Sequence, residues 1–423
     1  MADQRTLEPA SGPFQAGVNT PGDKSLSHRA LVFAALADAE SEITGLAPGH
    51  DVASTLGALE RLGLRRDGER FAPPVTPTDP GQPIDCGNSG TTIRILAGSL
   101  APLPFRVTLI GDASLSSRPM RRLVPPLAAL GATVLLSPDG TAPMTVGASD
   151  LHGADVAIDV ASAQVRSAFE LAAIHADDES SIDSPPGFRD HTERWFEAFG
   201  LGTTNGTRTQ VSPGRIPGAS YAIPGDPSSA AYVWASAALV PGSRVVTPNV
   251  SLNPGRLGFL SILEAMGAEV HGEVTGALHG DPVGTVSVVG AALEAVEVSG
   301  DIVAAAIDEL PLVAVLGAYA EGITVVRDAA ELRAKESDRT VSTAAMIRAL
   351  GGGAESTDDG FAVVGTGFLD GGSVDAAGDH RIAMAGAVAA TAAGGPVTIT
   401  GASVAAVSWP TFYDTMEAVW SSR

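Results

Sequence analysis

A helix that ends in an apolar residue followed by glycine recurs along this chain of 423 residues. The five glycines stand 68, 69, 67 and 84 residues apart, and a sixth helix follows near the C-terminus. Glycine after the last apolar residue is typical of a helix C-cap. The segments are LGALERLG (to Gly63), LVPPLAALG (Gly131), RWFEAFG (Gly200), FLSILEAMG (Gly267), TAAMIRALG (Gly351) and TFYDTMEAVW. A fixed period on this scale indicates a repeated supersecondary unit.

Each repeat also has an earlier part, in which a helix of small apolar residues is followed by a β-branched run. HRALVFAALADA and SEITG form this pair in the first repeat, and HRIAMAGAVAATA and PVTITG form it in the sixth. Alternation of helices and strands at this spacing predicts α/β units. Helices that carry Ala, Leu and Val on all faces predict burial within the fold.

The number of repeats predicts two domains. Six units of ~70 residues are too many for one hydrophobic core. Three units in each half would give two similar domains, with a cleft between the domains and a hinge. The sequence PGDP at 224–227 is a natural crossover, and a second near 20–22 would free the N-terminal strand to join the C-terminal half. We expect one domain at 20–225 with repeats 1 to 3. Residues 1–19 plus 226–423 should form a discontinuous domain with repeats 4 to 6.

Composition excludes several classes of protein. With 48 acidic and 26 basic residues, the formal charge is −22, which repels nucleic acid and anionic membranes. No apolar run reaches the ~18 residues that span a bilayer. The first twelve residues lack the apolar stretch of a secretory signal peptide, and the single cysteine, Cys86, cannot form an intrachain disulfide. These features predict a cytoplasmic protein.

Lysine is almost absent. Of the 26 basic residues only Lys24 and Lys335 are lysines, and each lies in a polar segment, PGDKSLSHRA and LRAKESDR. Chance in a GC-rich genome would explain this. The alternative is that both positions need a compact ammonium, for which a planar guanidinium does not substitute.

Basic residues gather where the small-residue helices begin. The Ser, Thr, Asp and Asn residues there are explained as N-caps. The cations are not, because the helix dipole disfavours them at this end. Helix N-termini with basic side chains form anion sites, so the pattern predicts a binder of small phosphorylated acids. The cations are Lys24, Arg29, Arg94, Arg166 and Arg381, joined by Arg118, Arg121 and Arg122 in GDASLSSRPMRR.

Two acidic segments offer acid–base chemistry. Asp308 and Glu309 open the fifth small-residue helix, and ELRAKESDR at 331–339 contains Lys335, Glu336, Asp338 and Arg339. A solvated helix face and a proton-transfer group both fit this charge run, because carboxylates beside cations transfer protons when burial tunes their pKa values. The chain lacks Walker A, HExxH, CxxC and GxSxG motifs, so we expect no metal and no cofactor. Cys86 is expected to be structural.

Seven motifs in order, from residue 21 to about 410, resemble those of the EPSP synthase family of enolpyruvyl transferases. They are PGDKSLSHRA, CGNSGTTIR, GDASLSSRPM, ASAQVRSA, DELP, ELRAKESDR and GDHRIAM, and they cover essentially the whole chain. The resemblance implies a two-domain inside-out α/β barrel with six βαβαββ-type repeats. It also implies transfer of the enolpyruvyl group of phosphoenolpyruvate to the 5-hydroxyl of shikimate 3-phosphate, with electrostatic stabilisation by Lys and Arg in place of a metal or cofactor.

The same resemblance implies roles for single residues. Asp308 would be the base for the 5-hydroxyl, Glu336 the proton donor to C3, and Lys335 would orient phosphate and assist proton transfer. His380 would support the site. The residues implied for shikimate 3-phosphate are Lys24, Ser25, Arg29, Ser162, Ala163, Gln164, Arg189, Asp308 and Lys335. Those implied for phosphoenolpyruvate are Lys24, Gly90, Arg118, Gln164, Arg339 and Arg381.

The chain departs from the common family pattern at four positions, with Val407 for Lys, Ile95 for Pro, Ala163 for Ser and His28 for Asn. None removes the implied acid–base pair. Gly90 leaves room beside phosphoenolpyruvate, so we expect sensitivity to glyphosate, which mimics that substrate. The family also implies a monomer that closes on its first substrate.

Two alternative functions are compatible with the same fold. The sister enzyme, which transfers enolpyruvate to UDP-N-acetylglucosamine, usually has Lys-Asn in the first motif and a reactive Cys in the second domain. Here Lys24 is followed by Ser25, and Cys86 precedes GNSG. A non-catalytic anion-binding scaffold of the same fold would be expected to lose Lys24, Asp308 or Glu336, and all three are present.

Overall fold

The computed structural model describes residues 3–422. The chain divides into two compact units, and we describe each by itself. Unit 1 consists of Met1–Pro21, Pro224–Gly276 and Pro282–Arg423, and unit 2 of Gly22–Ile223 and Ala277–Asp281. The crossovers at 21/22 and 223/224 lie two residues from the boundaries expected at 19/20 and 225/226. The excursion at 277–281 is not foreseen from the sequence.

Each unit contains three small sheets with a shared topology. The first strand pairs in parallel with the second, and the second pairs antiparallel with the third. The sheets of unit 2 are β14(Ser220–Ala222)-β3(Ser41–Thr44)-β5(Arg70–Ala72)-β4(Arg65–Asp67), β6(Ile84–Asp85)-β7(Arg106–Ile110)-β9(Met144–Gly147)-β8(Val134–Leu136) and β10(Asp155–Ala157)-β11(Ser180–Asp183)-β13(Arg208–Val211)-β12(Gly202–Asn205).

The sheets of unit 1 follow the same plan, and N-terminal strands complete two of them. Strand β1 runs antiparallel to β23, with Leu7 opposite Val397, so the sixth repeat takes its third strand from the start of the chain. The sheets are β2(Gln15–Gly17)-β15(Arg244–Ser251)-β17(Asp281–Val289)-β16(Glu269–Leu278), β18(Glu297–Val298)-β19(Glu321–Val326)-β21(Gly360–Thr366)-β20(Gly353–Thr357) and β22(Gly372–Asp375)-β23(Val397–Thr400)-β1(Gln4–Leu7).

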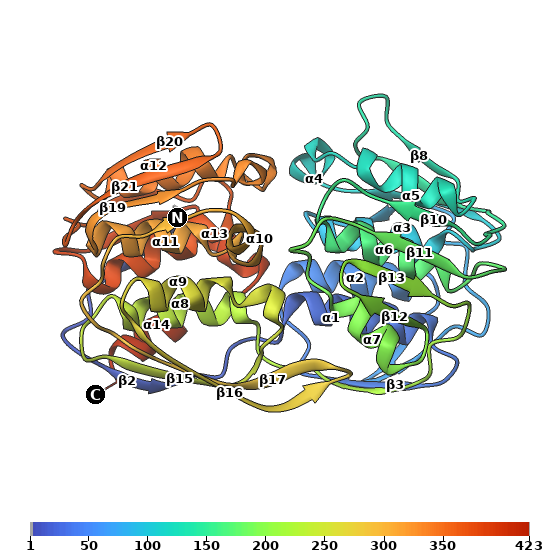
Figure 1. Ribbon diagram of the computed structural model, residues 1–423, viewed down its shortest axis with the longest axis horizontal. Helices are drawn as coiled ribbons and strands as arrows, with labels where there is room; N and C mark the ends of the chain where they lie inside the picture. Colours follow the sequence, from blue (N-terminus) through green and yellow to red (C-terminus); the bar gives the residue numbers. More distant parts are fainter. Residues whose placement is uncertain (1–2, 423) are drawn as a thin grey trace. The chain divides into compact units, whose positions relative to one another are not determined.

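Three buried helices form the centre of each unit. In α8 every residue is buried, and in α11 all but Tyr319 are buried, as the apolar composition on all faces predicts. Helix α3 packs against α1 and α6, while α8, α11 and α13 pack against one another; Figure 1 shows α11 and α13 side by side within unit 1. The helices are α1 (Lys24–Leu36), α3 (Gly90–Leu100) and α6 (Ala163–Ala173) in unit 2, and α8 (Pro227–Ala238), α11 (Leu310–Tyr319) and α13 (His380–Ala389) in unit 1.

A second helix in each repeat packs outside the central three. The glycines that follow five of them all have positive φ, from 70° to 105°, which confirms the predicted C-caps. The outer helices are α2 (His50–Arg61), α5 (Val124–Ala129), α7 (His191–Ala198), α9 (Gly258–Ala265), α12 (Arg339–Ala349) and α14 (Phe412–Trp420). Shorter elements are α4 (Ala113–Ser117), α10 (Asp301–Ala306), η1 (Arg121–Leu123), η2 (Pro254–Arg256), η3 (Ala330–Ala334), η4 (Ala390–Ala392) and η5 (Ala402–Val407). Between residues 3 and 422, no helix is long and apolar enough to cross a membrane.

Candidate active site

Five of the six central helices begin with a side-chain cap. Asp23, Ser89, Ser162, Asp226 and Asp379 each accept a hydrogen bond from a backbone N–H in the first turn. These caps satisfy N–H groups that would otherwise lack an intrahelical partner. Capping therefore explains these five residues, but it does not explain the charged side chains around them.

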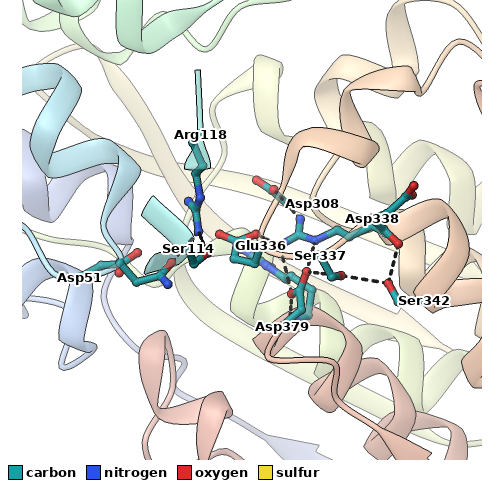
Figure 2. Close-up of polar contacts among 12 residues, drawn as sticks. Asp51, Ser114, Arg118, Asp308, Glu336, Ser337, Asp338, Ser342 and Asp379 are labelled. Atoms are coloured by element: carbon teal, nitrogen blue, oxygen red, sulfur yellow. Dashed lines mark hydrogen bonds and ion pairs between the residues drawn. The ribbon is translucent and has the colours of Figure 1, made fainter. Parts of the chain in front are cut away.

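In unit 1, one guanidinium is shared by three carboxylates. Arg339 Nη1 lies 3.3 Å from Asp308 Oδ1, Nη2 lies 2.5 Å from Glu336 Oε2, and Nε lies 2.8 Å from Asp379 Oδ2. Figure 2 shows the three carboxylates gathered at this point. The Arg339 side chain is 2% exposed, whereas Asp308 and Glu336 are 20% and 19% exposed. The buried cation thus holds two carboxylates that remain accessible to a ligand.

In this cluster, charge pairing affects the pKa values of Arg339 and Asp379 more than burial does. Burial alone would lower the pKa of Arg339, but the Asp379 and Glu336 carboxylates raise it above its ordinary value. Burial alone would raise the pKa of Asp379, but the Arg339 charge brings it below its ordinary value. Arg339 is therefore a permanent cation and Asp379 a permanent anion at neutral pH.

A second buried cation of unit 1 is Arg381, in the first turn of α13. Its Nη1 lies 3.8 Å from Glu309 Oε1 and 3.4 Å from the Tyr232 hydroxyl. Burial would lower the pKa of Arg381, but nearby Tyr232, Asp308 and Glu309 raise it well above its ordinary value. Burial raises the pKa of Tyr232 to about 12, so this hydroxyl is neutral. His380, the first residue of α13, is also buried.

The charge run at 331–339 divides into a structural part and a ligand-accessible part. Asp338 caps α12, since it accepts from Thr340 N at 3.1 Å, and it pairs with Arg333 at 2.8 Å. Lys335 is half-buried, and its ammonium has no hydrogen-bond or ion-pair partner among residues 3–422. Capping therefore explains Asp338, while the proton-transfer interpretation remains a prediction for Lys335 and Glu336.

In unit 2, the other lysine stands at the start of a helix. Lys24 Nζ, at the first residue of α1, lies 3.1 Å from Asp51 Oδ2 in the first turn of α2. Both side chains are partly accessible. In the same unit, Arg118 Nη2 donates to Asn88 Oδ1 at 2.5 Å and to Ser114 Oγ at 3.2 Å, and Figure 2 shows the Arg118 guanidinium close to Ser114.

The start of α3 is lined by two guanidiniums and a clamped amide. Gln164 Oε1 accepts from Arg94 Nη1 at 2.9 Å, and its Nε2 donates to Thr91 Oγ1 at 3.0 Å. A Cβ added to Gly90 would lie 2.7 Å from Arg94 Nη1 and 3.3 Å from Arg118 Nη1. Gly90 is therefore the point where these cations meet the N–H groups of a helix N-terminus, which favours an anion.

Arg29, in the second turn of α1, is 3% exposed and is held from three sides. Its Nε donates to Thr192, its Nη2 to Ser167 and its Nη1 to the Ser25 carbonyl. These bonds use three of the five guanidinium N–H groups. The remaining two N–H groups of Arg29 could donate hydrogen bonds to a ligand.

Arg166 corrects one expectation from the sequence. It was grouped with the anion-binding cations, but its side chain is fully buried, with Nε 2.6 Å from Glu193 Oε1 and the guanidinium 3.8 Å above the Phe188 ring. The grouping was wrong because a carboxylate of α7 already neutralises this charge inside unit 2. Of the remaining predicted residues, Ser162 and Ala163 begin α6, and Arg189 lies half-buried just before α7.

The sequence model of the EPSP synthase family (3-phosphoshikimate 1-carboxyvinyltransferase) matches residues 9–416. A 3-phosphoshikimate 1-carboxyvinyltransferase of Chloroflexus aurantiacus is 43% identical over 418 residues, 95% of this chain and 96% of that protein. One from Bacillus cereus is 38% identical over 425 residues, with 98% and 99% coverage. The chain belongs to the EPSP synthase family. A solved structure of EPSP synthase from Acinetobacter baumannii also matches, with a TM-score of 0.87, 36% identity and 98% of both chains covered.

Membership confirms the predicted fold class and makes the chain a transferase of the shikimate pathway. The family assignment gives no support to the alternative transfer to UDP-N-acetylglucosamine. Among the described residues 3–422, no group of three or more His, Cys, Asp or Glu side chains is arranged to hold a metal ion. Burial raises the pKa of Cys86 to about 12, so this thiol is not a nucleophile at neutral pH.

Three residues of the candidate site were not predicted from the sequence. Asp51, the partner of Lys24, was not singled out, because nothing in the sequence pairs residues 27 positions apart on different helices. Asn88 was noted only as part of a motif, and Asp379 only as a cap. For Asp51, the available signal was an acidic residue in the first turn of α2. Many ordinary helices begin with such a residue, so this signal is not specific.

Proposed function

We propose that this chain transfers the enolpyruvyl group of phosphoenolpyruvate to the 5-hydroxyl of shikimate 3-phosphate, giving 5-enolpyruvylshikimate 3-phosphate and phosphate. The 5-oxygen bonds to C2 of phosphoenolpyruvate while C3 gains a proton. The tetrahedral adduct then loses phosphate from C2 and a proton from C3, which restores the double bond. The observation that carries the proposal is the pair of accessible carboxylates, Asp308 and Glu336, held by one buried Arg339.

The acid–base roles are proposed for these carboxylates. Asp308 takes the proton of the 5-hydroxyl, and Glu336 gives a proton to C3 and later takes one back. Their shared contact with Arg339 supports this, because the guanidinium fixes both carboxylates without covering them. Lys335 lies one position before Glu336 and has an unengaged ammonium, which suits the proposed contact with the departing phosphate.

The anion-binding roles are proposed for the helix starts. Phosphoenolpyruvate would be held by Lys24, Arg118, Gln164, Arg339 and Arg381, beside Gly90. The meeting of α3 N–H groups with Arg94 and Arg118 at Gly90 supports this. Shikimate 3-phosphate would be held by Lys24, Ser25, Arg29, Ser162, Ala163, Gln164, Arg189, Asp308 and Lys335.

Three further features belong to the proposal. Glyphosate should inhibit by competing with phosphoenolpyruvate, since Gly90 keeps the space beside Arg118 open. Normal activity with a glyphosate inhibition constant far above the KM for phosphoenolpyruvate would contradict this. The protein should act as a monomer in the cytoplasm.

The deciding experiment is phosphate release from phosphoenolpyruvate, with shikimate 3-phosphate present or omitted. We expect release only when it is present, and a loss of about 100- to 10,000-fold in kcat for Asp308→Ala and Glu336→Ala. Arg333→Ala, which removes an exposed pair with Asp338, is the matched control and should keep kcat. Release with UDP-N-acetylglucosamine instead would move the chain to the sister activity. The absence of phosphate release with either acceptor would indicate a non-catalytic, anion-binding scaffold.

A further inference from the structure

A chain of buried hydroxyls connects α1, α2 and α3 within unit 2. His28 Nδ1 lies 2.7 Å from Thr55 Oγ1, which lies 2.6 Å from Thr92 Oγ1, which lies 2.7 Å from Ser89 Oγ. None of these four residues is more than 1% exposed. Each helix therefore contributes at least one member to a polar chain that solvent does not reach.

The bonds in this chain have one consistent direction. His28 Nε2 is buried without a hydrogen-bond partner among residues 3–422, so the ring proton belongs on Nδ1, where Thr55 accepts it. Thr55 then donates to Thr92, and Thr92 donates to Ser89 Oγ or to the Asp51 carbonyl at 3.3 Å. Burial, opposed only in part by nearby Asp51, lowers the pKa of His28 to about 3, so the ring is neutral at neutral pH.

Both ends of the chain lie next to residues of the candidate site. Ser89 immediately precedes Gly90, whose surroundings favour an anion. The Thr92 hydroxyl contacts the backbone of Asp51, whose carboxylate pairs with Lys24 at 3.1 Å. His28 lies one helical turn after Lys24. The hydroxyl chain therefore spans the distance between the Lys24–Asp51 pair and the start of α3.

We propose that His28, Thr55 and Thr92 are positioning residues that set the Lys24–Asp51 pair at a fixed distance from Gly90, and so set the geometry in which phosphoenolpyruvate is bound. The proposal rests on the proposed function. These residues act through others, because all three are sealed from solvent and hence from substrate. Hydroxyl hydrogen bonds suit this task, since they are directional, and an apolar isostere leaves its neighbour unsatisfied.

Matched substitutions separate the hydroxyl from the volume it fills. Thr92→Val and Thr55→Val keep the shape and lose the hydroxyl, while Thr92→Ser and Thr55→Ser keep the hydroxyl. His28→Leu removes the donor. His28→Asn retains one, because the Asn Nδ2 is two bonds beyond Cβ, as the His Nδ1 is. The measurements are kcat and the KM values for both substrates, with the melting temperature of each variant.

We expect the Val and Leu variants to lose about 10- to 100-fold in kcat/KM for phosphoenolpyruvate, since displacements of ~1 Å have effects of this size. The Ser and Asn variants should stay within about threefold of wild type, as the hydrogen bond is retained. The double variant Thr55→Val/Thr92→Val should lose no more than the worse single variant, because the residues act as one chain. Equal kcat/KM in Val and Ser variants would overturn the proposal.

A second measurement does not depend on activity. Amide hydrogen exchange at 49–53 and 88–93 should be about tenfold faster in Thr92→Val than in wild type or Thr92→Ser, since the starts of α2 and α3 lose their connection. Unchanged exchange would overturn the positioning role. If wild type releases no phosphate with shikimate 3-phosphate, the proposed function fails, and the exchange comparison alone decides the positioning role. If Thr92→Val does not fold, Thr55→Val serves for both measurements.

Discussion

The shape of the Arg339 side chain matters as much as its charge. Three different nitrogen atoms of one planar group face Asp308, Glu336 and Asp379. A lysine ammonium carries the same charge, but it is a compact point on a flexible stem and does not reproduce this fork. Positioning of the two proposed acid–base carboxylates thus depends on the guanidinium itself.

Arg339→Lys should therefore be far from conservative. We expect kcat to fall by about 100-fold or more and the free energy of unfolding to fall by about 3 kcal/mol, since a buried ion cluster loses part of its pairing. Phosphate release and urea unfolding measure the two effects. Arg333→Lys is the control, because its pair with Asp338 is 39% and 34% exposed and exposed pairs contribute less than about 1 kcal/mol. Equal effects of the two substitutions would show that the planar fork is unimportant.

His28 should make stability depend on pH. Its pKa is lowered from 6.5 to about 3 in the folded chain, so below pH 6.5 the unfolded chain binds a proton that the folded chain does not. Stability should therefore be full above pH 6.5 and decrease as pH falls toward 3. Between pH 7 and pH 5 this single group should reduce the free energy of unfolding by about 2 kcal/mol. Urea unfolding of wild type and His28→Asn at both pH values tests this, and an equal pH dependence in the two proteins would rule it out.

The sequence singled out Asp308, Glu336 and Arg339 as candidate site residues but not the contacts between them. Glu336 and Arg339 were singled out because they stand in a charged segment that contains one of only two lysines, and Asp308 because it opens the fifth small-residue helix. That three carboxylates converge on Arg339, with Asp379 contributed from 40 residues away, depends on packing of α12 against α13. The error over Arg166 has the same origin, since its neutralising Glu193 belongs to another helix.

Helix ends were the most predictable local feature. Gly200 ends α7 with φ of 70°, and a Cβ there would meet no atom within 4 Å. A substitution at this position therefore tests backbone conformation alone. Gly57, inside α2, is also in open space but has no positive φ, so it provides the opposite case in the same unit.

Gly200→Ala should destabilise the protein by about 1 kcal/mol, because a side chain disfavours the left-handed region. Gly57→Ala should stabilise it by about 0.5 to 1 kcal/mol, since alanine loses less entropy in a helix. Thermal unfolding of the two variants should therefore move in opposite directions. A shift of the same sign in both would mean that the glycine conformation is not the cause.

The turn between β16 and β17 was not predictable. Residues 277–281 group with unit 2, where Asp281 lies 3.0 Å from His191 Nδ1 and the His279 ring packs 4.7 Å from the Phe199 ring. The local sequence, ALHGD, contains only an ordinary turn signal. The position of this turn is determined by the aromatic contact of His279 and by the contact of Asp281 with buried His191. Both partners lie about 80 to 90 residues earlier in the sequence, and the repeat period does not reveal such contacts.

For the chain as a whole, the repeat period predicted more than any single motif. A unit that cannot bury its apolar face alone must recur and stack, so the six helix ends predicted six repeats in two groups of three. The family motifs then predicted that the chemistry lies at the helix starts. The positions of individual charged side chains on the surface could not be predicted, because they depend on the conformation of every loop. Composition gives only the net charge.

That net charge leads to a prediction for the whole protein. An excess of 22 carboxylates is brought closer together by folding, and this self-repulsion opposes the compact state. Buried ion pairs such as Arg339 with Asp379 are screened much less than exposed charges. Added salt should therefore remove more repulsion than attraction.

We expect the melting temperature to rise by roughly 2–4 °C between ~10 mM and ~500 mM NaCl, the equivalent of about 1 kcal/mol for units of this size. Because screening depends on ionic strength, KCl should give the same increase, and the increase should level off as the Debye length falls toward ~3 Å. Sucrose at equal osmolarity is the control and should not reproduce this levelling. A melting temperature that falls with salt would mean that exposed ion pairs, and not the excess carboxylates, dominate the surface electrostatics.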